Sequence, residues 1–390
     1  MWSKFGKKLL MMEMDNQAPQ STSVVWLPAS PSEGWASMDR YWRELDAIVY
    51  SSHFDDLRFS CALPNSPPSK TIKASRVSRF FEKYVAYPAR ARVQNAQIAH
   101  ILDHSYSHLI GSLPQKTRKV VTVFDLVPLE DSGSLTKSQI ERFRSTVTHL
   151  QKADHLISIS EETKRKLQIL LDISADKISV AVPGMDFCLF QKPVEKTNAV
   201  HSRLSNLPPI IFSIGSTASR KNLSSLPKIF CKMQPTFRNN GCCFVRAGEY
   251  LPESLKNEII SITGETRFLE LGPLFGDDLI AAYQSAKVLI FPSTLEGLTF
   301  VIPEAMASGC PVVTNTLTAN PEAGGTAAVY YTEGDYAMAA LQLTNILTQP
   351  ELHSKAKAEG IERARAMTWS HHFETVLRVY RKLGLQLKNC

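Results

Sequence analysis

Short runs of β-branched and aromatic residues alternate with longer amphipathic segments along most of the chain. Such an alternation predicts parallel sheets built from strand–helix units. The predicted strands of the first half are Ser23–Leu27, Ala47–Ser51, Ile98–Leu102, Lys119–Phe124, His155–Ser158 and Ile178–Val182. Those of the second half are Pro209–Ile214, Cys242–Ala247, Arg267–Leu271, Val288–Phe291, Pro311–Asn315 and Ala328–Tyr331. We therefore expect an α/β protein with two doubly wound domains.

A polar stretch at residues 188–206 separates the two halves. It contains a Lys-Pro step, and a Pro-Pro pair opens the strand that follows it, so it is a predicted hinge linker. The predicted domains are 1–190 and 207–368, followed by an amphipathic segment at 369–390. Because ligands of such sheets bind beyond the carboxyl ends of the strands, we expect the site in a cleft between the two domains.

Composition narrows the class of protein. The 390 residues are 44% hydrophobic and 21% charged, as in soluble globular proteins of two ordinary domains. No run of eighteen apolar residues exists, and the apolar patch near the start is too short for a signal peptide. The seven cysteines form no CxxC motif and no metal-binding spacing with histidine. These features predict reduced core thiols, a cytoplasmic protein and no metal site.

Positive charge is concentrated in the first half. The chain carries a net charge of +7, and residues 69–119 hold ten Lys or Arg against two acids. A nucleic acid, an anionic membrane or a lipid phosphate suits such a surface, whereas any single residue of it is better explained as part of a solvated helix face. No nucleic-acid-binding motif accompanies the charges, so we expect no nucleic-acid partner.

Two carboxylates eight positions apart, Glu296 and Glu304, mark the most informative segment. A strand is predicted to end at Phe291 and a helix to begin near Leu298, with Glu304 about two turns along it. The backbone N–H groups at the start of a helix lack partners and attract a diphosphate, which would place Leu298, Thr299 and Phe300 against it. Charged acceptors also suit sugar hydroxyls. An ordinary strand–helix junction with two solvated glutamates is the alternative.

A second candidate phosphate site follows the first strand of the second half. Gly215 permits a tight exit from the strand, and the adjacent Arg220 and Lys221 offer two positive charges to a diphosphate. An exposed basic turn is the alternative interpretation.

The Glu-x7-Glu spacing and the run Glu-Ala-Met-Ala-x-Gly-x-Pro-Val-Val at 304–313 resemble the retaining GT-B glycosyltransferases of family 4 (glycosyl transferases group 1). The resemblance implies two Rossmann-like domains facing a central cleft, with segment 369–390 as a helix that crosses back to the first domain. It implies a hexosyltransferase in which Glu296 positions the transferred sugar and Glu304 holds the donor ribose. Arg220 and Lys221 would stabilise the leaving diphosphate without a metal or other cofactor, in agreement with the missing Asp-x-Asp motif.

The same resemblance suggests three further site residues. His104 lies in the polar cluster His100-x2-Asp-His-x-Tyr-x-His108 and matches a histidine that touches the donor sugar. Asp125 matches the aspartate of a His-Asp-x-x-Pro strand end, although Phe124 replaces the histidine. Leu274, in the turn after Gly272, matches residues that line the base pocket.

The implied reaction moves a sugar from a nucleoside-diphosphate donor to a hydroxyl of a glycan or lipid-linked acceptor, in polysaccharide or glycolipid biosynthesis. GDP-mannose or a deoxysugar nucleotide is the favoured donor, and uridine and thymidine nucleotides stay open. Lipid-linked acceptors would place the enzyme loosely on the inner face of a membrane. The alternative is a catalytically inactive GT-B-like binding or scaffold subunit, suggested by Phe124.

Overall fold

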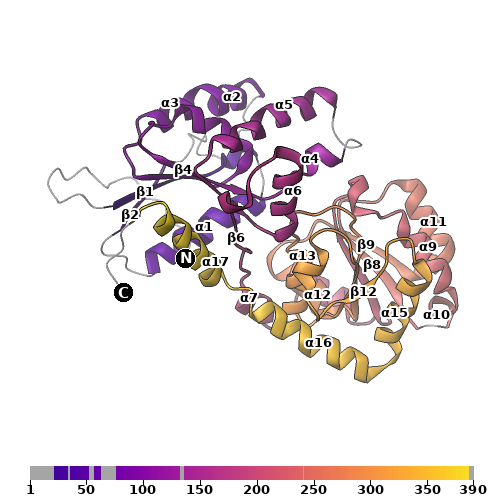
Figure 1. Ribbon diagram of the computed structural model, residues 1–390. Coiled ribbons are helices and arrows are strands. Elements are labelled where there is room, and N and C mark those ends of the chain that lie inside the picture. The colour runs from indigo at the N-terminus through magenta and orange to yellow at the C-terminus, as the bar shows by residue number, and fades with distance from the viewer. Residues whose placement is uncertain are drawn as a thin grey trace.

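The computed structural model describes residues 22–33, 36–51, 57–62, 76–131, 136–239 and 241–385. Its core is a pair of six-stranded parallel sheets, one in each half of the chain, with helices on both faces (Figure 1). The first sheet consists of β1 Thr22–Leu27, β2 Leu57–Cys61, β3 Ile98–Ile101, β4 Arg118–Val123, β5 His155–Ser158 and β6 Ile178–Val180. The second consists of β7 Ile210–Gly215, β8 Cys243–Gly248, β9 Phe268–Gly272, β10 Val288–Phe291, β11 Val312–Asn315 and β12 Val329–Tyr331.

Helical segments connect these strands. Those of the first half are η1 Pro31–Glu33, α1 Ala36–Ser51, α2 Arg76–Phe81, η2 Glu82–Ala86, α3 Tyr87–Arg92, η3 His104–Ser112, α4 Val127–Glu130, α5 Lys137–Val147, η4 Thr148–Lys152, α6 Glu161–Leu171 and η5 Ala175–Lys177. The predicted linker forms two short helices, α7 Phe187–Gln191 and α8 Ala199–Leu204. The remainder are η6 Ser219–Lys221, α9 Ser225–Lys232, α10 Gln234–Arg238, α11 Glu253–Thr263, η7 Glu265–Arg267, α12 Gly276–Ser285, α13 Val301–Ala307, α14 Asn320–Gly324, α15 Tyr336–Thr348, α16 Pro350–Arg365 and α17 Trp369–Lys382.

Eleven of the twelve predicted strands are confirmed, each with its ends within two residues of those predicted from the pattern. The prediction for Ala47–Ser51 was wrong, because these residues form the last turn of α1. Tyr41 and Leu45 are buried at helical spacing, and Ile48 continues the same face against the core. The 3.6-residue period of the whole segment therefore outweighs the local β propensity. The strand that pairs beside β1 is β2 instead.

Strand order locates the crevices in which ligands bind. The second sheet runs β12-β11-β10-β7-β8-β9, so successive connections leave in opposite directions from β7 and β10. The first sheet runs β2-β1-β3-β4-β5-β6 and has its corresponding reversal between β1 and β3. In open α/β sheets a crevice forms at such a switch point, outside the carboxyl ends of the two strands.

The last helix, α17, crosses back to the first half of the chain and lies beside α1 (Figure 1). A buried chain of polar groups fixes it there. His372 Nδ1 lies 3.1 Å from the carbonyl of Ala181, so it carries the proton and Nε2 accepts from the Tyr41 hydroxyl at 2.9 Å. On the other side, Tyr380 Oη lies 2.6 Å from His100 Nδ1 and accepts from the Trp26 indole at 3.0 Å. Satisfied buried polar groups of this kind fix one packing arrangement.

The two halves touch where Gly297 meets the end of β4. A Cβ atom on Gly297 would lie 2.2 Å from the carbonyl oxygen of Phe124 and 2.6 Å from Cβ of Asp125. The Ser160 hydroxyl, which caps α6, also donates to the carbonyl of Gly297 at 2.5 Å. Only glycine allows this approach, so the Glu-Gly step of the motif has a steric reason.

The cysteine prediction is confirmed only in part. Cys242, Cys243 and Cys310 are buried and free, as expected for core thiols, but Cys188 and Cys231 are exposed. Within the described part of the chain, none of the helices is at once long and apolar enough to span a bilayer.

Candidate active site at the interdomain contact

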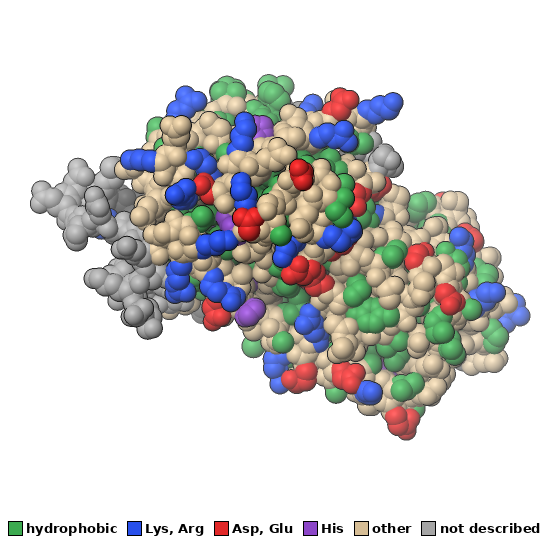
Figure 2. Space-filling view, viewed as in Figure 1, with side chains coloured by type: hydrophobic (Ala, Val, Ile, Leu, Met, Phe, Trp, Pro, Cys, Tyr) green, Lys and Arg blue, Asp and Glu red, His purple; other side chains and the backbone are tan. Residues whose placement is uncertain are grey.

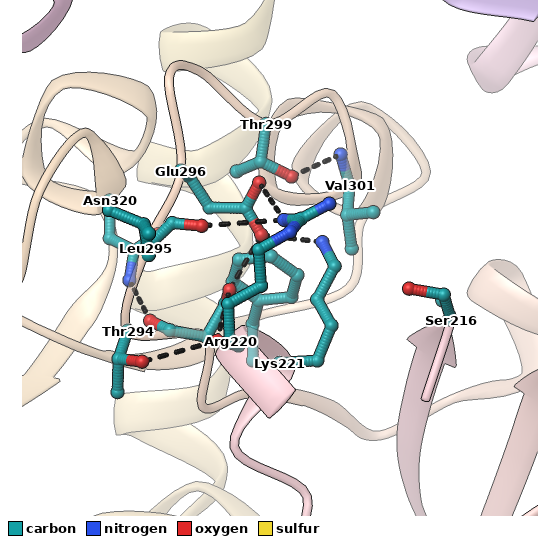
Figure 3. Close-up of polar contacts among 12 residues, drawn as sticks. Ser216, Arg220, Lys221, Thr294, Leu295, Glu296, Thr299, Val301 and Asn320 are labelled. Carbon is teal, nitrogen blue, oxygen red and sulfur yellow. Dashed lines mark hydrogen bonds and ion pairs between the residues drawn. The ribbon is translucent and has the colours of Figure 1, made fainter. Parts of the chain in front are cut away.

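Glu296 is the centre of a compact ion cluster beyond the carboxyl ends of β7 and β10 (Figure 3). Its Oε1 accepts from Lys221 Nζ at 2.5 Å and its Oε2 from Arg220 Nη1 at 3.1 Å. Ser293 donates to Oε1 at 2.6 Å. Two cations therefore share one carboxylate at the switch point of the second sheet, which leaves the group with a net positive charge.

The loop after β10 is held rigidly by amide side chains. The carbonyl of Ser293 accepts from the side chains of Asn315 and Asn320, each at 2.9 Å. The backbone N–H of Glu296 donates to Thr318 Oγ1 at 3.2 Å. These bonds fix the position of the Glu296 carboxylate before any ligand binds, which is the preorganisation that electrostatic catalysis requires.

The loop after β7 has its own support. Gly215 has a φ of +135°, which favours glycine, and a Cβ on Gly248 would lie 2.2 Å from the Gly215 carbonyl oxygen. The buried guanidinium of Arg246 donates to the carbonyls of Gly215 at 2.6 Å and Ser216 at 3.3 Å. Figure 3 shows Ser216 across from Lys221, so Arg246 braces the side of the site opposite the two cations.

Burial sets the electrostatics of the cluster. Desolvation lowers the pKa of Lys221 below its usual 10.5, and the nearby Glu296 opposes that shift. The side chains of Lys221 and Glu296 are 13% and 8% exposed. In such a poorly hydrated site, a charge-assisted bond to a phosphate or hydroxyl is stronger than at the surface.

Glu304 is held by the opposite domain. Its Oε1 accepts from Nη1 of Arg40, on α1, at 3.0 Å, and its Oε2 accepts from the Tyr283 hydroxyl at 3.4 Å. Desolvation raises the pKa of Glu304 from 4.5 to about 7, although Arg40 acts in the opposite direction. The prediction that Glu304 lies two turns into its helix was wrong, since α13 begins at Val301 and Glu304 is in its first turn.

The expected helix start near Leu298 was also wrong, by three residues. Leu298, Thr299 and Phe300 precede α13, with Phe300 as its N-cap, because Pro303 follows closely and Leu298 packs against the cores of both domains. The first N–H of α13, from Val301, donates to Thr299 Oγ1 at 3.2 Å. That amide therefore has a partner from the chain itself.

The raised pKa of Glu304 gives a pH prediction. Its carboxyl is neutral below about pH 7 and ionised above, so the predicted acceptor for a ribose hydroxyl becomes ionised as pH rises. We expect the Kd of an intact nucleotide sugar to fall several-fold between about pH 6 and pH 8, and Glu304→Gln to remove that slope. Titration calorimetry at a series of pH values measures it. A slope retained in Glu304→Gln would assign the titration to another group.

The same shift has a consequence for folding. Because the pKa of Glu304 is raised in the folded protein, its ionisation is disfavoured there. Its contribution to the free energy of unfolding is therefore full below pH 4.5 and falls as pH rises to about 7.

The first-domain residues predicted from the resemblance lie beside this cluster. His104 Nδ1 accepts from the backbone N–H of Phe124 at 3.4 Å, which leaves its proton on Nε2. Asp125 Oδ1 accepts from the N–H of Val127 at 3.0 Å, and its Cβ borders Gly297. Phe124, which binds His104, precedes Asp125, and both Phe124 and Asp125 border Gly297, the residue after Glu296. The structure thus brings His104, Asp125 and Glu296 close together.

The other two histidines of the predicted cluster point elsewhere. His100 is buried in the α17 network, where desolvation lowers its pKa to about 3, so it is neutral at pH 7. His108 Nε2 donates to the carbonyl of Lys83 at 2.9 Å. The three histidines therefore lie in three environments, and among them His104 contacts the backbone of Phe124 at the end of β4.

Leu274 lies at the same edge of the second sheet but away from Glu296. It follows β9, the edge strand, which β7 and β8 separate from β10. Its half-buried side chain packs on the domain core. Its role in a base pocket stays a prediction.

Three contributors to the site were missed by the sequence interpretation or treated there as scaffold. Arg40 comes from a helix whose sequence carries no motif, and only the fold places it against Glu304. Ser160 caps α6, and its hydroxyl also donates to the carbonyl of Gly297. Arg246 offered one signal, a charged residue inside an otherwise apolar strand.

Among the described residues, no group of three or more His, Cys, Asp or Glu could hold a metal ion.

Comparisons with known proteins support the fold. Residues 208–349, which carry β7 through β12 and the ion cluster, match the family model described as glycosyl transferases group 1. Sucrose-phosphate synthase from Thermosynechococcus elongatus has the same fold, with a TM-score of 0.71, 17% identity, and coverage of 93% of this chain and 99% of that one. The chain has the GT-B fold, and its residues 208–349 are similar to the group 1 glycosyltransferases.

The chain also resembles curated mannosyltransferases, one of which is much longer than this chain. It is 24% identical over 294 residues to the serotype-specific mannosyltransferase WbdA of Escherichia coli, an alignment that covers 72% of this chain. That alignment covers only 36% of the relative, so the chain spans about a third of it. It is 21% identical over 321 residues to the O-antigen chain mannosyltransferase RfbU of Salmonella typhimurium, covering 80% of this chain and 84% of RfbU.

Proposed function

We propose that this protein transfers a sugar from a nucleoside-diphosphate donor to a hydroxyl of a glycan or lipid-linked acceptor. The observation that supports this proposal most strongly is the Arg220–Lys221–Glu296 cluster at the switch point of the second sheet. Gly297, next to Glu296, brings this cluster into contact with Asp125 of the first domain. Ligand crevices of doubly wound sheets occur at that point. The family match and the two mannosyltransferase relatives support the same activity, in polysaccharide synthesis.

The chemistry follows from the charges. A departing nucleoside diphosphate develops negative charge, and Arg220 and Lys221 are positioned to take it. As the cations turn to phosphate, Glu296 is released to accept from hydroxyls of the transferred sugar. Glu304 would hold the ribose in exchange for Arg40, and His104 and Asp125 would contact the sugar from the first domain. Attack from the side of the leaving diphosphate would retain the configuration of the sugar.

The donor identity is the part that sequence and fold constrain least. We propose GDP-mannose or a deoxysugar nucleotide, and the names of WbdA and RfbU favour mannose. A thermal-shift screen of the purified protein against GDP, UDP, dTDP and ADP tests the base. At a hundred times its Kd the correct nucleotide should stabilise the fold by about 2.7 kcal/mol.

The screen also separates the enzyme from an inactive binding subunit. The nucleotide sugar that stabilises the protein is incubated with it alone and with candidate acceptors, and released nucleotide is measured. Release above the rate of the Lys221→Ala variant supports a transferase. Tight nucleotide binding without any release would favour the binding or scaffold subunit that Phe124 suggests.

Transfer is expected to survive removal of metal ions. Arg220 and Lys221 supply two positive charges where a diphosphate would lie, so the leaving group does not require a divalent cation. Assays with and without EDTA should give equal rates. A complete loss in EDTA that Mn²⁺ reverses would show that the phosphate site has been misinterpreted.

We also propose loose attachment to an anionic membrane through α2 and η2. Val77, Phe81 and Val85 are largely exposed and share one helical face. Lys and Arg side chains are frequent over the same domain (Figure 2). Part of that charge is paired, as Lys83 is with Glu33 and Arg118 with Asp154, while Lys70 and Lys73 lie outside the described residues.

Sedimentation with vesicles containing phosphatidylglycerol tests this attachment. We expect binding at low ionic strength and its loss in high salt, because such attraction falls off within a Debye length. Phe81→Asp with Val85→Asp should abolish it, whereas Ile169→Asp, at an exposed apolar residue of α6, should not. Equal recovery in the supernatant at both salt concentrations would indicate a soluble enzyme.

A further inference from the structure

A cavity lies in the first domain, apart from the ion cluster. Its volume is about 560 Å³, and it lies between α2–η2 and α5 beside Glu33 of η1. The lining residues are Glu33, Arg79, Phe80, Lys83, Tyr84, Gln139 and Arg142. Three cations and two aromatic rings therefore surround a space large enough for a small organic ligand.

The charges of this cavity are only partly neutralised. Lys83 Nζ lies 3.2 Å from Glu33 Oε1 and 4.3 Å from the centre of the Tyr106 ring. Arg79 and Arg142 have no ion-pair partner in the described part of the chain, and the buried Nε of Arg79 lacks an acceptor there. One carboxylate against three cations leaves a positive cavity whose guanidinium groups suit a planar or tetrahedral oxyanion.

The cavity lies at the switch point of the first sheet, as the ion cluster lies at the switch point of the second. Glu33 follows β1, and η3 follows β3, so both lie at the switch point between these strands. The Tyr106 hydroxyl of η3 donates to Glu33 Oε1 at 3.2 Å. A ligand in this position would lie where doubly wound sheets ordinarily bind one.

Two structural connections join the cavity to the predicted active site. His104 and Tyr106 belong to the same short helix, η3, so the residue that holds Glu33 is two positions from the predicted catalytic histidine. The His104 ring also packs 5.6 Å from that of Phe143, the neighbour of Arg142 on α5. The cavity is therefore on the acceptor side, adjacent to the contact between the domains.

We propose that this cavity binds an anionic group, a phosphate or a carboxylate, carried by the acceptor sugar. This inference rests on the proposed function and names its acceptor class. Arg79 and Arg142 bind the oxyanion, Lys83 adds charge from its pair with Glu33, and the exposed ring of Phe80 packs against the apolar face of the sugar. A neutral sugar would leave the arginines without partners, so the cavity selects charged acceptors.

Direct binding tests the proposal without turnover. Glucose 6-phosphate, glucuronate and neutral glucose are titrated by calorimetry into the wild type and into the pair Arg79→Gln with Arg142→Gln. We expect the two anionic sugars to bind the wild type and glucose not to bind. The arginine pair should raise the Kd of the anionic sugars by at least about tenfold, since two charge-assisted contacts are lost.

Two controls make the result specific. Lys137→Gln with Arg144→Gln removes equal charge from the exposed face of α5 outside the cavity and should leave binding unchanged. Lys221→Ala removes the competing phosphate site and should also leave it unchanged. Binding that Lys221→Ala abolishes but the arginine pair does not would place the anion in the donor site and overturn the proposal, as would an absence of binding by both anionic sugars.

Vesicles containing phosphatidylglycerol distinguish a sugar from a lipid headgroup. The assignment to a sugar would be overturned by two results together. Neither anionic sugar would bind, and cosedimentation would be lowered in the arginine-pair variant but not in the control-pair variant. Because no arm requires catalysis, failure of the proposed function and failure of this inference are separable. A protein inactive in transfer still reports on the cavity, and an active one can fail to bind the anionic sugars.

Discussion

Replacing Glu296 or Lys221 with alanine is expected to lower the rate of sugar transfer by at least about a hundredfold with the fold intact. Lys221→Ala removes a buried positive charge from the predicted position of the leaving diphosphate. Glu296→Ala removes the acceptor of the sugar hydroxyls and leaves Lys221 beside Arg220 without a counter-charge. The measurement is kcat/KM with the donor identified by the nucleotide screen, together with the unfolding temperature of each variant.

Glu265→Ala is the matched control, because Glu265 is exposed in η7 and outside the ion cluster. Its turnover should equal that of the wild type. Variants Glu296→Ala and Lys221→Ala that unfold near the wild-type temperature and retain full turnover would refute the assignment of the site. Combining the two substitutions should cost less than the sum of the separate effects, since the side chains share one contact.

Gly184→Ala is expected to destabilise the protein by about 3 kcal/mol, because the added methyl group displaces the start of α17 from its packing position. Gly184 precedes the backbone contact in which the N–H of Met185 donates to the carbonyl of Met367 at 3.0 Å. A Cβ at this position would lie 2.0 Å from the backbone nitrogen of Trp369 and 2.4 Å from the carbonyl carbon of Thr368. Both are backbone atoms, so no side-chain rotation can relieve the clash. Urea unfolding followed by circular dichroism measures the loss.

Gly111→Ala is the appropriate comparison, since a Cβ there meets nothing within 4 Å. It should change the free energy of unfolding by less than about 1 kcal/mol. Equal stabilities of Gly184→Ala and the wild type would mean that α17 can shift without cost. The buried bonds of Tyr380 and His372 to the first domain would then contribute little to holding the helix.

The strand–helix alternation was sufficient to predict two parallel sheets, and the sites of eleven strands. Most of those strands have their own apolar run, because a strand covered by helices on both faces is largely apolar. Ala47–Ser51 was misassigned because a β-branched run at the end of a helix looks like a strand when its neighbours are ignored. The local pattern thus identifies a buried strand more reliably than it locates the end of an amphipathic helix.

The residues of the ion cluster could also be named from sequence, since Arg220, Lys221 and Glu296 follow β7 and β10 within short loops. Short loops leave side chains near the strand ends that carry them, so chain order already places them at one sheet edge. The helix start was missed because Pro303 and the packing of Leu298 between two cores delay it to Val301. That packing depends on the other domain.

Contacts between distant segments were decided by the tertiary structure alone. Arg40 and Glu304 are 264 positions apart, and neither position signals the other. The histidines at 100, 104 and 108 form one cluster in sequence but turn to three environments, because successive residues of a strand and a tight helix point in different directions. The cavity beside Glu33 likewise gathers side chains from three segments. Sequence therefore determined the fold class and named the residues of the ion cluster, whereas the contacts between the two halves of the chain required the folded structure.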